Sequence, residues 1–114
     1  MNQRFANTPK PPYYAVMFTN QLSQHNEGYE QMGQKMFELA IEQPGCLGAE
    51  STRDIHGVGI TISYWKDEAS INEWKAQTQH VFAQRKGIEQ WYEHYELRVA
   101  KVERAYSGPH GRTL

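Results

Sequence analysis

One segment of the chain constrains the fold more than any other, because it combines a strand, a turn and a helix start. From Val58 to Lys66 two sets of residues alternate strictly, Val58, Ile60, Ile62 and Tyr64 against Gly59, Thr61, Ser63 and Trp65. Such alternation is typical of a β-strand with two different faces. The turn Asp54-Ile55-His56-Gly57 joins it to a second strand-like run, Cys46 to Arg53, and Asp67 can cap a helix. The segment therefore predicts a β-hairpin that leads directly into a helix.

The flanking sequence supplies the remaining elements. Tyr13 to Leu22 reads as a first strand, with one side formed by Tyr14, Val16, Phe18, Asn20 and Leu22. Between Asn26 and Gln43, apolar residues recur at three- and four-residue steps, which predicts an amphipathic helix that Pro44 and Gly45 end. A second helix has the apolar side Ile71, Trp74, Val81 and Phe82, with a break at Gly87 and a last turn near Trp91. A final strand is predicted over Tyr92 to Tyr106.

The order β-α-β-β-α-β predicts a ferredoxin-like α+β fold. Strands joined without crossing form an antiparallel four-stranded sheet with both helices on one face. The other face then needs a cover, which predicts a homodimer whose two sheets stack or close into a barrel. A chain of 114 residues has room for one domain. We expect residues 1–12 to form an extended arm that could lie across a neighbouring subunit, residues 13–106 the domain, and residues 107–114 a flexible tail.

Charge and composition exclude several classes of partner. The net charge is −1, so the protein has no excess of positive charge that would attract nucleic acid or anionic membranes. No signal peptide or run of about 18 apolar residues is present, and the single cysteine, Cys46, cannot form an intrachain disulfide. No pair of histidines has the spacing of a metal site. These features predict a cytoplasmic protein that does not engage membranes.

Four segments resemble the antibiotic-biosynthesis-monooxygenase family, whose members include quinone-forming and haem-degrading monooxygenases. They are PPYYAVMFTNQ, EQPGCLGAES, GITISYWKDEASINEWK and AQRKGIEQWYEHYELRVAKVERAYS. Together they cover nearly all of Pro11 to Ser107. The resemblance implies a dimeric α+β barrel with a cavity for a small organic molecule.

In the quinone-forming branch, oxygen reacts without metal, flavin or haem, and the substrate supplies the electrons. Its pattern has Asn and Trp on the third strand, Tyr early in the second helix and Arg later in it. Trp65 and Arg85 resemble two of these positions, whereas Thr61 stands at the Asn position and Ile71 at the Tyr position. The resemblance implies that Trp65 and Arg85 polarise and stabilise oxygen.

In the haem-degrading branch, the pattern is Asn on the first strand, Trp on the second helix and an iron-binding His ten residues later. Asn20 and Trp74 resemble the first two, but the tenth residue after Trp74 is Gln84, a poor iron ligand. His80, six residues after Trp74, could replace it only if the helix is locally irregular.

The preferred hypothesis is a cofactor-independent monooxygenase that oxidises a small aromatic or quinol-like molecule. Its catalytic candidates are Trp65 and Arg85, and its substrate-binding candidates are Asn20, Thr61, Trp74 and His80. No cofactor is required, with haem as the alternative for a haem-degrading enzyme. A third hypothesis is a non-catalytic dimer that binds a small molecule in the same cavity, as the departures at Thr61, Ile71 and Gln84 suggest.

Overall fold

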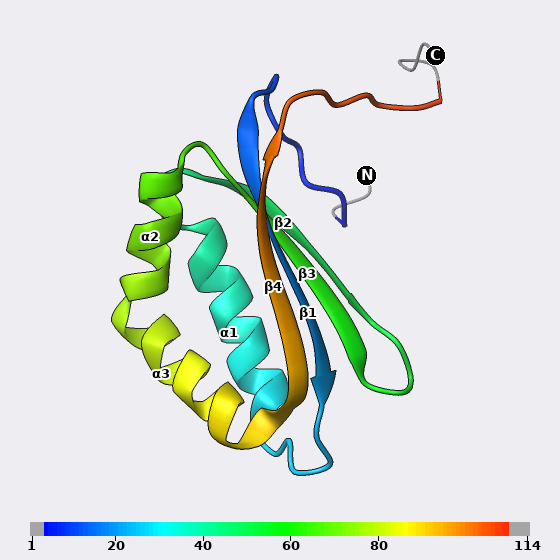
Figure 1. The fold of residues 1–114 in the computed structure, drawn as a ribbon, viewed down its shortest axis with the longest axis vertical. Coiled ribbons are helices and arrows are strands. Elements are labelled where there is room, and N and C mark those ends of the chain that lie inside the picture. Colours follow the sequence, from blue (N-terminus) through cyan, green and yellow to red (C-terminus); the bar gives the residue numbers. More distant parts are fainter. Residues whose placement is uncertain (1–3, 110–114) are drawn as a thin grey trace.

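The computed structural model describes residues 4–109, apart from the side chains of residues 78 and 79. The helices gather on one side of a four-stranded sheet (Figure 1), which confirms the ferredoxin-like α+β prediction. In chain order the elements are β1 (Tyr13–Leu22), α1 (Tyr29–Ile41), β2 (Cys46–Arg53), β3 (Val58–Trp65), α2 (Glu68–Ala76), α3 (Thr78–Lys86), the π-helical turn η1 (Gly87–Trp91) and β4 (Tyr92–Val102). No helix among these residues is long and apolar enough to cross a membrane.

The register of the sheet assigns each strand residue to one of two faces. The strand order is β2-β3-β1-β4, and all neighbours are antiparallel. Paired residues point to the same face, and Trp65 stacks on Trp74 of α2, so the face of Trp65 is the helix-facing side. It comprises Tyr14, Val16, Phe18 and Asn20 of β1, Ser51 and Arg53 of β2, Gly59, Thr61, Ser63 and Trp65 of β3, and Tyr95, Leu97 and Val99 of β4.

The predicted second helix is correct at its start and wrong in its continuity. The Asp67 carboxylate accepts a hydrogen bond from the Ser70 N–H at 2.8 Å, as a cap should. The helix then breaks at Gln77, whose ψ of 134° is extended, and the Gln77 side chain accepts from the His80 N–H to begin α3. At Gly87 the α-helix ends and passes without a gap into the π-helical turn η1, which forms the last turn up to Trp91 as predicted. Gln77 thus stops one helix and caps the next.

Two element boundaries also differ from the prediction. Gly28 precedes α1 with a φ of 85°, a left-handed conformation that cannot belong to the helix, so α1 begins at Tyr29 and not at Asn26. The strand β4 ends at Val102, which pairs with Tyr13, the first residue of β1. Residues 103–106 have no strand to pair with and are not part of the sheet.

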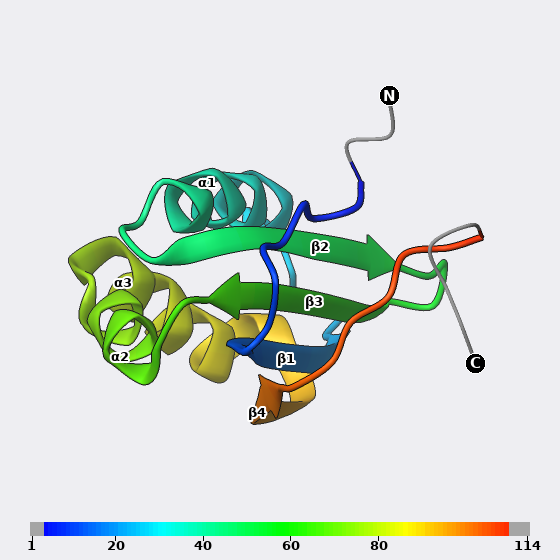
Figure 2. The same ribbon diagram turned by 90° about the horizontal axis from the view of Figure 1, so that it is seen from above.

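The second face of the sheet carries no helix. It exposes Val58 and Ile60 of β3. The part of the N-terminal arm that is described crosses the ends of β2 and β3 (Figure 2) and is held there, because the Ala6 N–H donates to Glu50 Oε2 at 2.9 Å. The Tyr64 hydroxyl donates to the same carboxylate. The arm therefore covers one end of this open face of its own sheet. Residues 1–3 of the arm and 110–114 of the expected tail lie outside the described residues.

Candidate functional site

A buried amide on the helix-facing side is the first sign of a binding site. The Asn20 side chain is 3 % exposed, and neither Oδ1 nor Nδ2 has a hydrogen-bond partner among the described residues. Burying an amide without partners costs about 1–3 kcal/mol. A bound molecule would remove this cost by pairing with both atoms, so Asn20 points to a ligand with a polar group.

Aromatic rings surround the same end of the sheet. Asn20 pairs in register with Tyr95 of β4. Phe18 lies two residues before Asn20 on the same face, and its ring centroid is 5.3 Å from that of Tyr92 and 5.6 Å from that of Tyr95. Further ring contacts complete an aromatic cluster of Phe18, Tyr29, Trp91, Tyr92 and Tyr95. A buried amide beside such a cluster suits a flat organic ligand.

The phenol of Tyr92 remains protonated near neutral pH. Burial raises the pKa of Tyr92 well above its ordinary value of 10.0, and the neighbouring Tyr29 phenol acts in the same direction. The positive charge of Arg53 opposes the rise. Tyr92 therefore offers a neutral hydroxyl within the cluster, and Arg53 is close enough for its charge to act on that hydroxyl.

Arg53 is a site residue that the sequence analysis missed. It ends β2, and its Nη2 donates to the Tyr29 hydroxyl at 2.8 Å while its Nη1 donates to the Gly57 carbonyl at 2.7 Å. A signal was present in the sequence, because Arg53 and Gly59 flank the hairpin turn and must pair. A glycine inside a strand often marks the close approach of another group, and here a Cβ at Gly59 would collide with the Arg53 guanidinium.

Trp65, Trp74 and His80 form a stack at another part of the helix-facing side. The Trp65 and Trp74 rings are 6.3 Å apart, and the His80 ring lies 4.1 Å from Trp74 and nearly parallel to it. Trp65 is fully buried and its indole N–H donates to Ser63 Oγ, so the one donor with which Trp65 could polarise oxygen is already engaged.

His80 is held in its neutral form within this stack. Its Nδ1 lies 2.9 Å from the Trp74 carbonyl oxygen. Burial lowers the pKa of His80 below 6.5, although the Trp74 carbonyl acts in the opposite direction. A neutral imidazole whose Nδ1–H donates to a carbonyl has a lone pair on Nε2. Within residues 4–109, however, no three His, Cys, Asp or Glu side chains are grouped to hold a metal ion.

The structure separates two sets of residues that the sequence analysis placed in one site. The β1 residue that pairs with Trp65 is Tyr14, whereas Asn20 pairs with Gly59. Six residues of strand correspond to about 20 Å. Trp65 therefore lies at one end of the helix-facing side and Asn20 at the other. Thr61 lies between them, and its hydroxyl is 2.8 Å from Ser51 Oγ.

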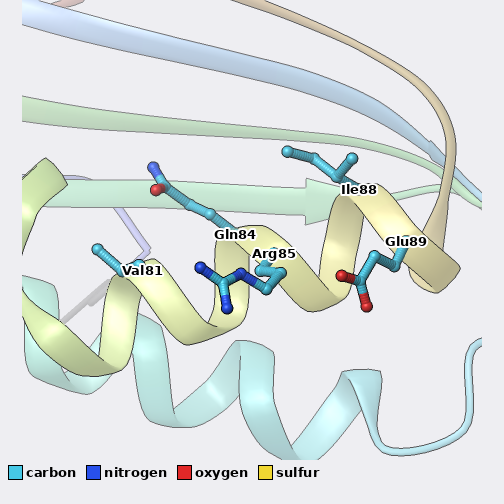
Figure 3. A pocket seen from close by; sticks show the side chains of 5 residues that line it. All are labelled: Val81, Gln84, Arg85, Ile88 and Glu89. Atoms are coloured by element: carbon cyan, nitrogen blue, oxygen red, sulfur yellow. The ribbon is translucent and has the colours of Figure 1, made fainter.

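Arg85 lies in a third place, on the exposed surface of α3. It lines a shallow hollow of about 270 Å³ with Val81, Gln84, Ile88 and Glu89. These residues recur at helical spacing along α3 and η1 and line the hollow together (Figure 3). No strand residue among the predicted site residues lines this hollow. The structure thus does not bring Arg85 together with Asn20, Thr61 or Trp65 there.

The amino-acid sequence matches one family model and a relative of known sequence. A family model described as "Antibiotic biosynthesis monooxygenase" matches residues 16–86. The chain is 50 % identical over 97 residues to "Uncharacterized protein YqjZ" of Bacillus subtilis, an alignment that covers 85 % of each chain.

Solved structures share the fold at low sequence identity. The structure of Rv0793 from Mycobacterium tuberculosis superposes with a TM-score of 0.74 at 10 % identity, over 83 % of this chain and 99 % of that one. SnoaB from Streptomyces nogalater, a cofactor-independent oxygenase crystallised as a point mutant, superposes with a TM-score of 0.70 at 12 % identity, over 82 % of this chain and 95 % of that one. At these identities the structures support the fold alone.

Proposed function

The chain belongs to the antibiotic biosynthesis monooxygenase family, and from this premise we propose that it is a cofactor-independent monooxygenase acting on a small aromatic or quinol-like molecule. The proposal places the substrate between the sheet and the helices, beside Asn20 and the aromatic cluster. A fold relative, SnoaB, is a cofactor-independent oxygenase.

The observation that carries the proposal is the unpartnered amide of Asn20. Its Nδ2 can donate to an oxygen on the substrate ring, and its Oδ1 can accept from a neighbouring hydroxyl. The rings of Phe18, Tyr92 and Tyr95 can pack on the substrate faces and edges. Both polar and aromatic parts of a quinol would thus find complementary groups in one place.

The chain's contribution to such a reaction would be electrostatic. The substrate loses a proton to become a phenolate or enolate, and oxygen adds to its electron-rich carbon to give a peroxide. Loss of water from the peroxide leaves a carbonyl, so that one oxygen atom enters the product and the other leaves as water, and the oxidised carbon loses two hydrogens. Donors at fixed positions, such as Asn20 Nδ2, stabilise the negative charge before and during oxygen addition.

An oxygen electrode tests this proposal with anthrone and a set of hydroquinones as substrates. The wild-type protein should consume one O₂ per product, and catalase should return no oxygen, because no hydrogen peroxide is released. The Asn20→Leu variant should lose most of this activity. The matched control is the same substitution at Asn72, since Asn72 is exposed on α2.

Two outcomes would reject the enzymatic proposal. Oxygen uptake no faster than that of the substrate alone would favour the non-catalytic binder, provided that Asn20→Leu still lowers the affinity for the same molecules. Uptake that is the same in Asn20→Leu as in wild type and Asn72→Leu would place the reaction elsewhere.

The proposal includes a homodimer that covers the open face of the sheet. Val58 and Ile60 are 40 % and 41 % exposed on that face, and a partner sheet would bury them. We expect Ile60→Glu to give a monomer in sedimentation velocity, because it would place a charge in the interface. The control is Ile55→Glu, since Ile55 lies in the hairpin turn and is 94 % exposed. Identical sedimentation of Ile60→Glu and wild type would remove this face from the interface.

A second candidate, haem cleavage, is supported by one observation at His80. The break at Gln77 supplies the local irregularity that His80 needs to take the position of an iron ligand. A neutral imidazole with a lone pair on Nε2 fits iron, and haem would supply oxygen activation when bound. His80 would hold it, and the Trp74 carbonyl would orient the imidazole.

Absorbance titration with haem tests the second candidate. A saturable Soret band that disappears in His80→Ala, persists in His94→Ala and decays with ascorbate under air would make haem cleavage the leading function. His94 is the control because it is exposed and lies 2.7 Å from Glu96. A band that is equal in both variants would exclude His80 as a ligand.

A further inference from the structure

The guanidinium of Arg53 is directed across the sheet toward Asn20. Arg53 pairs with Gly59, and Gly59 pairs in turn with Asn20 on the next strand. The guanidinium occupies the space that a Cβ of Gly59 would fill. Side chains of directly paired residues are about 5 Å apart, so the group above Gly59 is the immediate neighbour of the Asn20 side chain.

The charge of Arg53 has no acidic partner among residues 4–109. Two of its five N–H groups are used, by the Tyr29 hydroxyl and the Gly57 carbonyl. The guanidinium also lies over the Tyr29 ring, whose centroid is 5.1 Å away. Arg53 is thus a half-buried cation with free donors, held in place by two hydrogen bonds.

The amide of Asn20, the neighbour of this guanidinium across Gly59, is unsatisfied at both of its polar atoms. It is buried and has no hydrogen bond to Arg53 or to any other described residue. An oxygen atom that carries negative charge would accept from both groups at once. Guanidinium groups bind such oxygens through parallel N–H bonds that are shorter and stronger than neutral ones.

We propose that Asn20, Arg53 and Tyr29 form a subsite for an anionic oxygen, so that the ligand is an aromatic molecule carrying a carboxylate or a phenolate. This inference rests on the proposed function for the location of the site and extends it to the charge of the substrate. Arg53 acts as a specificity-determining residue, Tyr29 positions its guanidinium, and the aromatic cluster packs on the ring. For a phenol, the proton goes to solvent when the molecule binds.

Isothermal titration calorimetry tests the subsite with three naphthalene probes. We expect 2-naphthoate to bind the wild-type protein about ten- to a hundredfold more tightly than the neutral 2-naphthamide, as one charge-assisted hydrogen bond predicts. For 2-naphthol, titrations in two buffers of different ionisation enthalpy reveal whether a proton is released. Release of a proton shows that 2-naphthol binds as its phenolate. If no proton is released while 2-naphthoate binds tightly, the subsite accepts carboxylates and not phenolates.

Matched variants assign the preference to Arg53. Arg53→Gln should bind naphthoate and naphthamide equally, whereas Arg53→Lys should keep part of the preference because it retains the charge. Arg104→Gln is the control, since Arg104 is exposed and lies beyond the end of β4. Gly59→Ala leaves the arginine in the chain and displaces its guanidinium, so it should also abolish the preference. This variant provides the test if Arg53→Gln does not fold.

The results separate the subsite from the reaction. Equal binding of naphthoate and naphthamide to wild type, or a preference that survives both Arg53→Gln and Gly59→Ala, would overturn the inference. An Arg53-dependent preference without oxygen uptake would keep the subsite and reject the monooxygenase. Oxygen uptake with neutral quinols that does not depend on Arg53 would keep the monooxygenase and reject the subsite.

Discussion

Replacement of Asn20 by leucine should stabilise the free protein. Both polar atoms of its side chain are buried without partners among the described residues, and leucine has nearly the same size and no polar atom. The variant should therefore gain about 1–3 kcal/mol in the free energy of unfolding, the cost of burying an unpaired amide. At a typical urea dependence of about 1.5 kcal/mol per molar, a gain of about 2 kcal/mol moves the urea midpoint upward by about 1 M.

Urea titration followed by circular dichroism measures this gain, at one protein concentration because dimerisation contributes to stability. The same substitution at Asn26 is the control, since Asn26 Nδ2 donates to the Ser23 carbonyl at 2.7 Å. Asn26→Leu should lose about 0.5–1.5 kcal/mol. If Asn20→Leu is destabilised as much as Asn26→Leu, the Asn20 amide is hydrogen-bonded in the free protein, and the inference of a ligand from its lack of partners fails.

Three further predictions test other parts of the structure. Gly45→Ala should lose about 2–3 kcal/mol in the same urea assay, because Gly45 has a φ of +88° and a Cβ there would collide with the buried Ser70; a loss below about 1 kcal/mol would contradict this packing. Asp67→Ala should lose about 0.5–2 kcal/mol by removing the cap of α2, and unchanged stability would mean that the cap contributes nothing. Because the pKa of His80 is lowered in the folded protein, the unfolded chain takes up a proton at this residue at a higher pH than the folded chain does. The stability linked to His80 is therefore complete above about pH 6.5, and it decreases as the pH falls through the lower pKa of the folded state. In His80→Phe the urea midpoint should depend less on pH over that range. Identical pH profiles of the variant and the wild type would refute the attribution of this dependence to His80.

Most of the fold was predictable because local signals agreed with the topology. The alternation in β3, the turn before it and the cap at Asp67 each specify one element, and their order leaves few ways to connect the sheet. The break at Gln77 was not predictable from apolar spacing, because a glutamine in a helix gives no warning that its side chain will cap the next one. The end of β4 depends on where β1 begins, which is a property of the pair and not of either strand.

The candidate site was only partly predictable, for a similar reason. Asn20 was found because it resembles the first-strand asparagine of the haem-degrading branch, and the register then placed it on the helix-facing side. Arg53 was missed because its importance comes from the glycine opposite and the tyrosine above, which are 6 and 24 residues away in the chain. Trp65, Trp74 and Arg85 matched family positions one by one, but spacing along the sequence did not reveal that Arg85 and Asn20 lie away from the stack of Trp65 and Trp74.

The stack of Trp65, Trp74 and His80 also provides the protein with an optical signal. A protonated imidazole quenches the emission of an indole that it touches, and the His80 ring lies 4.1 Å from that of Trp74. Tryptophan emission should therefore decrease as His80 gains its proton, so that the ionisation of this residue can be followed by fluorescence without a label.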